Sequence, residues 1–142
     1  MSGQLRVGVE RVPVTPPIGI RQCGYAARDL GSTHLLDGLY ATAMVCDNGE
    51  TQIALVACDL IFVHPTTVAC VRDEVARRAH IPHDHVMLCC SHTHSGPITY
   101  AGPEQGEREH AYITTLAYQI AGAICAAQTR LQPARIGYGQ GN

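Results

Sequence analysis

The sequence predicts an α/β fold, a layered mixed β-sheet with packed helices. Three observations support this. Short apolar segments have strand character, two longer segments repeat apolar residues at helical spacing, and the order is strand, hairpin, helix, strand, helix, strand. A chain of 142 residues can bury one sizeable core. We therefore expect a single domain over residues 1–142.

The first part of the chain predicts a strand, a long loop and a hairpin. β-Branched residues alternate over residues 5–14, and a Thr-Pro-Pro sequence ends this strand. Glycines interrupt residues 18–37, a long loop of the kind that is often functional. Apolar runs at 39–46 and 52–58 flank an Asn-Gly pair, which is a strong hairpin signal.

The second part predicts two helices around a strand. Residues 66–79 place valines on one face after Pro65 and a capping threonine. Residues 85–90 form a short apolar run typical of a buried strand, and residues 107–129 repeat apolar residues at helical spacing. Residues 134–139 resemble a strand that is just beginning. We therefore expect the chain to be a truncated part of a larger domain.

Composition excludes several functions. All ten basic residues are arginines, and they are scattered along the sequence, so they do not predict a basic patch that would bind nucleic acid. The lack of lysine excludes Schiff-base chemistry and a phosphate-binding loop. The first residues lack a signal-peptide core, and no run reaches the roughly 20 apolar residues that span a bilayer.

The seven cysteines form no CxxC pair. Four of them, Cys46, Cys58, Cys89 and Cys90, lie in apolar runs, where a reduced thiol behaves as a small buried hydrophobe. We therefore expect a reducing cytoplasmic location. A redox or metal duty for the adjacent pair Cys89-Cys90 is the alternative.

Polar residues follow two predicted strands. Asp59 comes directly after residues 52–58, and His92 and His94 follow residues 85–90. If the two strands are parallel, their carboxyl ends share an edge, where α/β sheets collect ligands. On an extended backbone the two imidazoles point the same way, and imidazole nitrogen is a preferred zinc ligand. A chance His-x-His string is the alternative.

Other polar residues give weaker signals. The histidines His80, His83 and His85 surround a proline and are expected to be solvated loop residues. His34 and His64 stay unassigned. The glutamates Glu104, Glu107 and Glu109 are expected to complement the positive start of the second helix.

Several segments resemble, in order, the amino-terminal domain of the neutral/alkaline ceramidases. The most specific is His92-Thr93-His94-Ser95-Gly96-Pro97 after an apolar strand. The others are Gly8-Val9-Glu10-Arg11, Thr15-Pro16-Pro17, Gly24-Tyr25-Ala26, Leu39-Tyr40-Ala41, Ala57-Cys58-Asp59-Leu60 and His85-Val86-Met87-Leu88.

The resemblance implies a zinc-dependent amidohydrolase that cleaves the N-acyl amide of ceramide-like lipids with a zinc-activated water. It implies zinc ligation at His92, with His94 as the neighbouring site histidine and second candidate ligand. His94 and Asp59 are the candidate catalytic residues, and Asp59 could orient an imidazole. The family's remaining ligands, a histidine, a glutamate and a tyrosine, lie beyond this chain's length. Cys89-Cys90 and Ile98-Thr99-Tyr100 depart from the family pattern, so the substrate need not be ceramide.

Three other interpretations compete with this one. A metallo-β-lactamase-like hydrolase is rejected, because its pattern continues with Asp and His where this chain has Gly96 and Pro97. A catalytically incomplete fragment or binding module remains open. So does a zinc site that a partner chain or oligomerisation completes. The sequence does not predict the oligomeric state.

Overall fold

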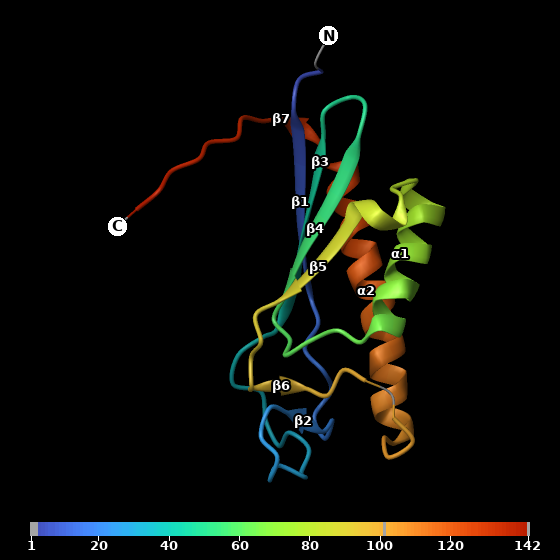
Figure 1. The fold of residues 1–142 in the computed structure, drawn as a ribbon. Helices are drawn as coiled ribbons and strands as arrows, with labels where there is room; N and C mark the ends of the chain where they lie inside the picture. The colour runs from blue at the N-terminus through green and yellow to red at the C-terminus, as the bar shows by residue number, and fades with distance from the viewer. Residues whose placement is uncertain (1–2, 101, 142) are drawn as a thin grey trace.

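The computed structural model describes residues 3–100 and 102–141 (Figure 1). It confirms the α/β fold with a layered mixed sheet. In chain order the elements are β1 (Arg6–Pro13), β2 (Gln22–Cys23), β3 (Tyr40–Asp47), β4 (Gln52–Cys58), α1 (Pro65–Ala79), a 3₁₀ turn (His83–His85), β5 (Val86–Cys90), β6 (Gly96–Pro97), α2 (Glu107–Thr129) and β7 (Gln132–Pro133).

The main sheet has five strands in the order β5-β4-β3-β1-β7. The predicted hairpin is β3 and β4, which pair antiparallel from Ala41 opposite Cys58 to Asp47 opposite Gln52. β4 and β5 pair in parallel, with Cys58 opposite Cys90, and α1 lies in the connection between them. The carboxyl ends of these two strands therefore lie at the same edge of the sheet.

Both helices lie on one face of the sheet (Figure 1). α2 packs on β1 and β3, and α1 packs against α2. The core between these layers includes Val45, Val56, Leu116, Ile120 and Ile124, all fully buried. Burying each such side chain contributes roughly 1.5–3 kcal/mol.

A glycine allows the close approach of strand and helix. A Cβ at Gly8 of β1 would lie 1.9 Å from the carbonyl oxygen of Ala127 in α2. Farther along, the hydroxyl of buried Tyr112 donates to the carbonyl of Val14 at 2.7 Å. α2 is therefore held against the first strand and the segment that follows it.

The long loop at residues 18–37 is more ordered than its composition predicts. It contains β2, which pairs antiparallel with β6, so that Gln22 lies opposite Pro97 and Cys23 opposite Gly96. An isolated bridge joins Arg21 and Gly31. These pairs are too short for a periodic signal in the sequence, but they attach the loop to the segment that follows the two site histidines.

Three expectations about local structure were wrong. The strand expected at 134–139 is absent from the described residues, because Pro133 already pairs with Arg6, at the start of β1, and the chain runs on past the strand's end. The cap of α1 is His64, whose ring accepts from the amide of Thr66, in place of a threonine. Cys89 is exposed, because it points to the face of the sheet that no helix covers.

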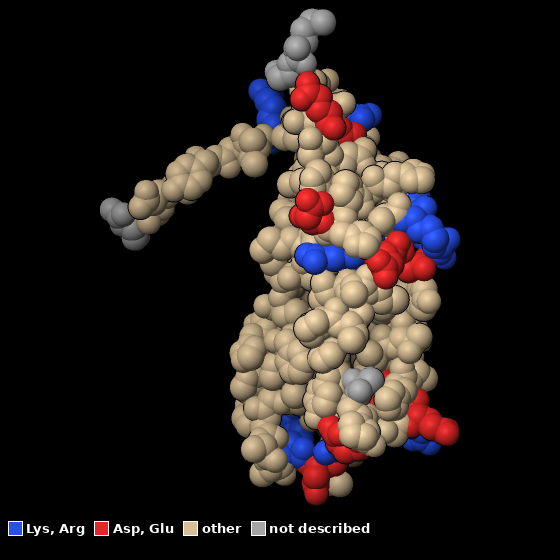
Figure 2. Space-filling view, turned by 45° about the vertical axis from the view of Figure 1, so that its right-hand side comes forward, with Lys and Arg blue, Asp and Glu red and all other residues tan. Residues whose placement is uncertain are grey.

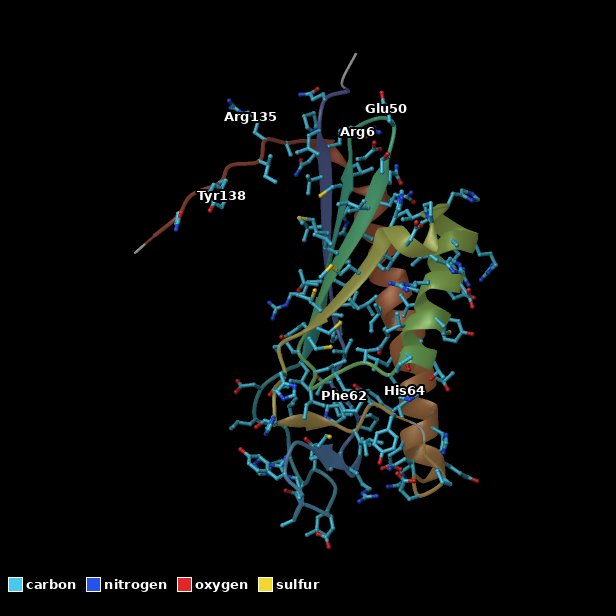
Figure 3. All side chains as sticks on the ribbon, in the orientation of Figure 1. Arg6, Glu50, Phe62, His64, Arg135 and Tyr138 are labelled. Carbon is cyan, nitrogen blue, oxygen red and sulfur yellow. The ribbon has the colours of Figure 1, made fainter. Side chains whose placement is uncertain are left out.

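The surface in Figure 2 carries acidic and basic side chains in small groups, with wide uncharged areas between them. No helix among the described residues combines the length and hydropathy needed to cross a membrane. Beyond β7, residues 134–141 extend away from the body, where Tyr138 is 92% exposed (Figure 3).

Candidate metal centre

The segments that follow β4 and β5 run side by side. The amide of Ser91 donates to the carbonyl of Cys58 at 3.0 Å, and the amide of His92 donates to the carbonyl of Leu60 at 3.0 Å. The expectation that these two strands are parallel and end at one edge is therefore confirmed. This arrangement brings the Asp59 segment and the histidine segment together.

His92 does not have the extended backbone expected from the sequence. Its φ is +58°, in the left-handed region that residues other than glycine rarely occupy. The rings of His92 and His94 nevertheless lie close, with centroids 5.1 Å apart and planes at 66°. The backbone turn at His92, rather than strand alternation, places the imidazoles together.

One ring nitrogen of His92 already has a partner. Its Nδ1 lies 3.0 Å from the carbonyl oxygen of Ile61. A carbonyl accepts only, so this contact assigns the proton to Nδ1 and leaves the lone pair on Nε2 for a metal. His92 is exposed, so Nε2 is accessible.

The carboxylate of Asp59 does not make the expected contact with His92 or His94. Its carboxylate accepts from the amide of Tyr40 at 3.0 Å, and no hydrogen bond joins it to an imidazole among the described residues. The carbonyl of Ile61 orients His92 instead. Asp59 thus ties the end of β4 to the start of β3.

The loop at 18–37 holds His94. The ring of Tyr25 meets the His94 ring edge-on, with centroids 5.4 Å apart, and the guanidinium of Arg28 donates to the His94 carbonyl at 2.9 Å. Gly24 has φ +107°, and a Cβ there would lie 2.6 Å from the Cβ of His94. Gly24 and Tyr25 belong to the family pattern in the sequence, but no signal there assigns them to the site.

Aromatic residues lie next to the Ile61 segment. The rings of Phe62 and Tyr100 stack with centroids 6.4 Å apart, and the hydroxyl of Thr99 donates to the Phe62 carbonyl at 2.6 Å. The Tyr100 hydroxyl donates to Glu104 at 2.5 Å, which raises the pKa of Tyr100 and lowers that of Glu104. Sequence reasoning missed Phe62 and Tyr100, which carry no spacing signal.

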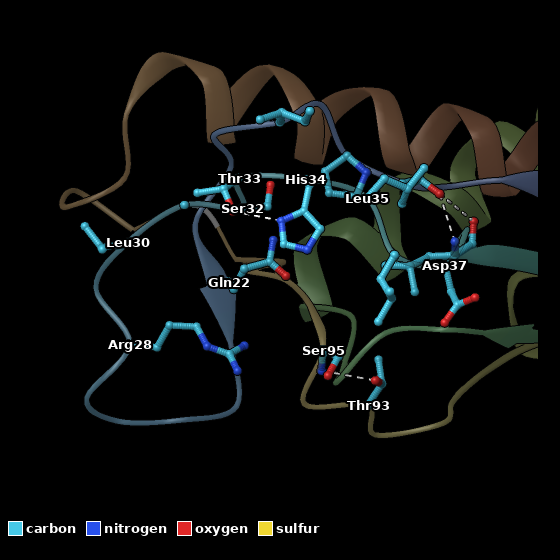
Figure 4. A pocket seen from close by; sticks show the side chains of 16 residues that line it. Gln22, Arg28, Leu30, Ser32, Thr33, His34, Leu35, Asp37, Thr93 and Ser95 are labelled. Atoms are coloured by element: carbon cyan, nitrogen blue, oxygen red, sulfur yellow. Dashed lines mark hydrogen bonds between the residues drawn. The ribbon is translucent and has the colours of Figure 1, made fainter.

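A cavity of about 630 Å³ lies beside the histidine segment (Figure 4). Its wall combines polar side chains, including Thr93, Ser95 and His34, with the leucines Leu30, Leu35, Leu36 and Leu39. Neither His92 nor His94 lines it. The cavity therefore adjoins the histidine pair without containing it, and His34, which the sequence left unassigned, belongs to its wall.

The remaining candidates have structural contacts. His80 ends α1 in a left-handed conformation, and His85 contacts the carbonyl of Gln52 at 2.9 Å. Glu109 is buried at the start of α2. Burial alone would raise the pKa of Glu109, but amide hydrogen bonds, chiefly from Arg21, outweigh burial and lower it. Glu109 lies in the first turn of α2, where its negative charge complements the positive end of the helix, as expected.

The adjacent thiols Cys89 and Cys90 face opposite sides of β5, as strand alternation requires. Cys90 lies opposite Cys58 in the strand register. The interaction between the two thiols lowers the pKa of Cys90, and together with burial it raises the pKa of Cys58. A joint redox or metal duty for Cys89 and Cys90 has no geometric support.

A complete metal site is absent from the described part of the chain: no group of three or more His, Cys, Asp or Glu side chains there could hold an ion. A catalytic zinc normally takes three protein ligands. His92 and His94 could supply two ligands, and further ligands would have to come from elsewhere.

No known protein family and no curated protein matches this chain. Solved structures similar to it include two ceramidases. The neutral ceramidase of Pseudomonas aeruginosa is 23% identical, with a TM-score of 0.76 over 94% of this chain and 23% of that chain. A ceramidase complexed with C2 is 22% identical, with a TM-score of 0.76 over 92% of this chain and 22% of that chain. The chain therefore has a ceramidase-like fold and spans less than a quarter of these neighbours.

Proposed function

We propose that this chain contributes part of a zinc-dependent amidohydrolase site that acts on the N-acyl amide of ceramide-like lipids. The observation that carries the proposal is the histidine pair at the shared edge of β4 and β5, with ring centroids 5.1 Å apart. The similarity of the fold to that of two ceramidases supports the substrate class.

The donor atoms fit zinc. The contact from the Ile61 carbonyl to Nδ1 of His92 is the kind of second contact that orients a ligating imidazole and leaves Nε2 for the metal. Tyr25 contacts the ring of His94 and Arg28 binds its carbonyl, and these contacts hold His94 with its ring centroid 5.1 Å from that of His92. A bound zinc would polarise the amide carbonyl and lower the pKa of a bound water toward about 7.

The contacts of His94 and Asp59 support a different role for each. If His92 ligates the zinc and His94 does not, the half-buried ring of His94 could take or return a proton beside it, and His94 is then the stronger candidate for proton transfer. Asp59, through its bond to the Tyr40 amide, would keep the end of β4 in place below the histidines. In this role Asp59 positions the histidine segment through the backbone and does not contact the substrate or the metal.

The neighbouring cavity supports a lipid substrate. Four leucines on its wall offer an apolar surface, while Thr93 and Ser95 offer hydroxyls next to the histidine segment. An acyl chain would bind the apolar leucine surface, and a polar amide headgroup would bind the hydroxyls.

A catalytically incomplete chain is the second candidate function. It is favoured by the absence of a third ligand among the described residues. Under this alternative the chain binds zinc weakly or not at all, unless a partner chain or another copy adds ligands.

Zinc content of the purified protein separates these possibilities. Elemental analysis would compare wild type with His92→Ala and His94→Ala, and the matched control is His110→Ala, an exposed histidine on α2. Hydrolysis of a fluorogenic ceramide would be assayed on the same samples. We expect zinc to be lost in the two site variants and retained in the control.

Wild type that carries no zinc at any added concentration would reject the metal site. Zinc without turnover would support an incomplete site. Zinc that survives both site substitutions would place the metal elsewhere in the chain.

A further inference from the structure

The connection between β4 and α1 at residues 60–63 has no regular secondary structure. In the described part of the chain it takes part in three hydrogen bonds, and a backbone carbonyl accepts each of them. The Leu60 carbonyl accepts from the amide of His92 at 3.0 Å, and the Ile61 carbonyl accepts from Nδ1 of His92 at 3.0 Å. The Phe62 carbonyl accepts from the hydroxyl of Thr99 at 2.6 Å. His92 and Thr99 therefore hold three successive carbonyls of this connection.

Thr99 is a fixed hydrogen-bond donor. It is fully buried, so water does not compete for its hydroxyl. The preceding amide, that of Ile98, donates to the carbonyl of Arg21 at 2.9 Å, and the following ring, that of Tyr100, stacks on Phe62 with centroids 6.4 Å apart. Phe62, which Figure 3 shows on the connection that leads to α1, is thus held by its carbonyl and by its ring.

Side-chain packing alone does not direct the Ile61 carbonyl. Leu60 is fully buried and Ile61 is 8% exposed, so their side chains fix where the connection lies. A peptide plane between two fixed Cα atoms can still turn, because the φ and ψ angles on either side of it are soft. The hydrogen bonds to the Leu60 and Phe62 carbonyls hold the peptide planes before and after that of Ile61, and so they limit this rotation.

We propose that Thr99 is a positioning residue of the candidate metal centre: by holding the Phe62 carbonyl, its hydroxyl keeps the Ile61 carbonyl aimed at Nδ1 of His92. Without this hydroxyl the Phe62 carbonyl loses its donor, and the connection is free to turn. The Ile61 carbonyl then loses its alignment with the ring. Thr99 acts through the Ile61 carbonyl and does not contact the metal or the substrate.

Loss of the hydroxyl has two expected effects. The first concerns the proton of the His92 ring, because the hydrogen bond at one imidazole nitrogen decides which of the two carries it. The ratio of the two tautomers should shift about fivefold toward Nε2, which corresponds to the net contribution of one hydrogen bond. The second effect rests on the proposed function. Since Nε2 is the nitrogen left for zinc, zinc affinity should fall about tenfold, the lower end of the range for groups that orient a ligating imidazole.

Nitrogen-15 NMR of the His92 ring in the zinc-free full chain measures the first effect, at about pH 8.5 so that imidazoles are neutral. Thr99→Val and Thr99→Ala remove the hydroxyl, and Thr99→Ser retains it. The matched control is Thr115→Val on α2, which removes a hydroxyl that donates to the Ala111 carbonyl at 2.9 Å. We expect the shift in the first two variants and the wild-type tautomer ratio in the other two. Circular dichroism would establish that each variant is folded.

A wild-type tautomer ratio in both Thr99→Val and Thr99→Ala would overturn the proposal. So would an equal shift in Thr99→Ser or Thr115→Val, because the Thr99 hydroxyl would then not be the cause. Wild type with the His92 proton mainly on Nε2 would overturn it whatever the variants do, since the Ile61 carbonyl would not direct the ring.

Zinc titration of the same samples separates this inference from the proposed function. If wild type binds no zinc while the tautomer ratio shifts as expected, the positioning role of Thr99 is supported and the metal site is rejected. If wild type and Thr99→Val bind zinc equally well through His92, the positioning role is overturned and the metal site is supported. His92→Ala identifies the zinc that depends on this ring.

Discussion

Replacing Gly24 with alanine tests whether the loop at 18–37 holds the histidine pair. Gly24 has φ +107°, a backbone conformation that L side chains rarely adopt. A Cβ there would meet His94 at 2.6 Å from its Cβ and 2.7 Å from its Cα and Cγ. Because part of this contact is backbone, a rotamer change of His94 cannot relieve it.

The size of the effect follows from these contacts. Carbon atoms pack at about 3.5 Å, so the loop would have to move by about 1 Å. The unfavourable φ adds roughly 1–3 kcal/mol if the loop stays in place. We expect the loop to detach from His94 with a loss of about 2 kcal/mol of local stability, which corresponds to about a 30-fold change in an opening equilibrium.

Amide hydrogen exchange measures this opening directly. The amide of Ile98 donates to the carbonyl of Arg21 at 2.9 Å, next to the pairing of β2 with β6. In Gly24→Ala this amide should exchange about 30-fold faster than in wild type. The matched control is Gly122→Ala in α2, where a Cβ meets nothing within 4 Å. It should stabilise the protein by about 0.5–1 kcal/mol and leave Ile98 protected.

Unchanged exchange of Ile98 in Gly24→Ala would refute the reasoning. It would mean that the loop tolerates a side chain at Gly24 and that His94 is positioned by its own segment alone. Faster exchange in Gly122→Ala would show that Ile98 reports general loosening rather than the loop contact.

Two further predictions concern the fold. Tyr112→Phe removes the buried hydrogen bond from the tyrosine hydroxyl to the Val14 carbonyl and should lower the free energy of unfolding by about 1 kcal/mol, measured by urea titration. The control is Tyr118→Phe, at an exposed tyrosine of the same helix, which should change the stability little. Equal stabilities of the two variants would contradict this prediction. The amide of Gly49, above all, lowers the pKa of Asp47 in the folded protein. This stabilisation is therefore present above the unfolded value of about 3.9 and is lost as the pH falls through the lower folded value. Asp47→Asn should reduce stability at pH 7 and flatten its fall in acid, and an unchanged pH profile would argue against the contact.

Local signals account for the elements that the sequence predicted correctly. The hairpin follows from turn chemistry, since Asn48 accepts from the amides of Glu50 and Thr51, and Gly49 has φ +89°. α2 begins and ends at Glu107–Thr129, as its periodicity predicts. Both signals act within a few residues, so neighbouring sequence is enough to read them.

Pairings between distant segments could not be predicted in this way. β2 and β6 are two residues long and pair across more than 70 positions, as in Gln22 with Pro97. The expected strand at 134–139 failed for a related reason, because strand character in a sequence does not show whether a neighbour is present to pair with it. The partner chain, the zinc ion and the cytoplasmic location stay predictions.

For the candidate site, the sequence by itself determined the residue types and their place at two strand ends: Asp59 after one, His92 and His94 after the other. Only the tertiary structure decided how they meet. The left-handed turn at His92 is held by two hydrogen bonds, from its amide to the carbonyl of Leu60 and from its ring to the carbonyl of Ile61. Both partners lie in the segment that follows β4. Contacts of this kind depend on which segments the sheet brings side by side, and no short stretch of sequence encodes that.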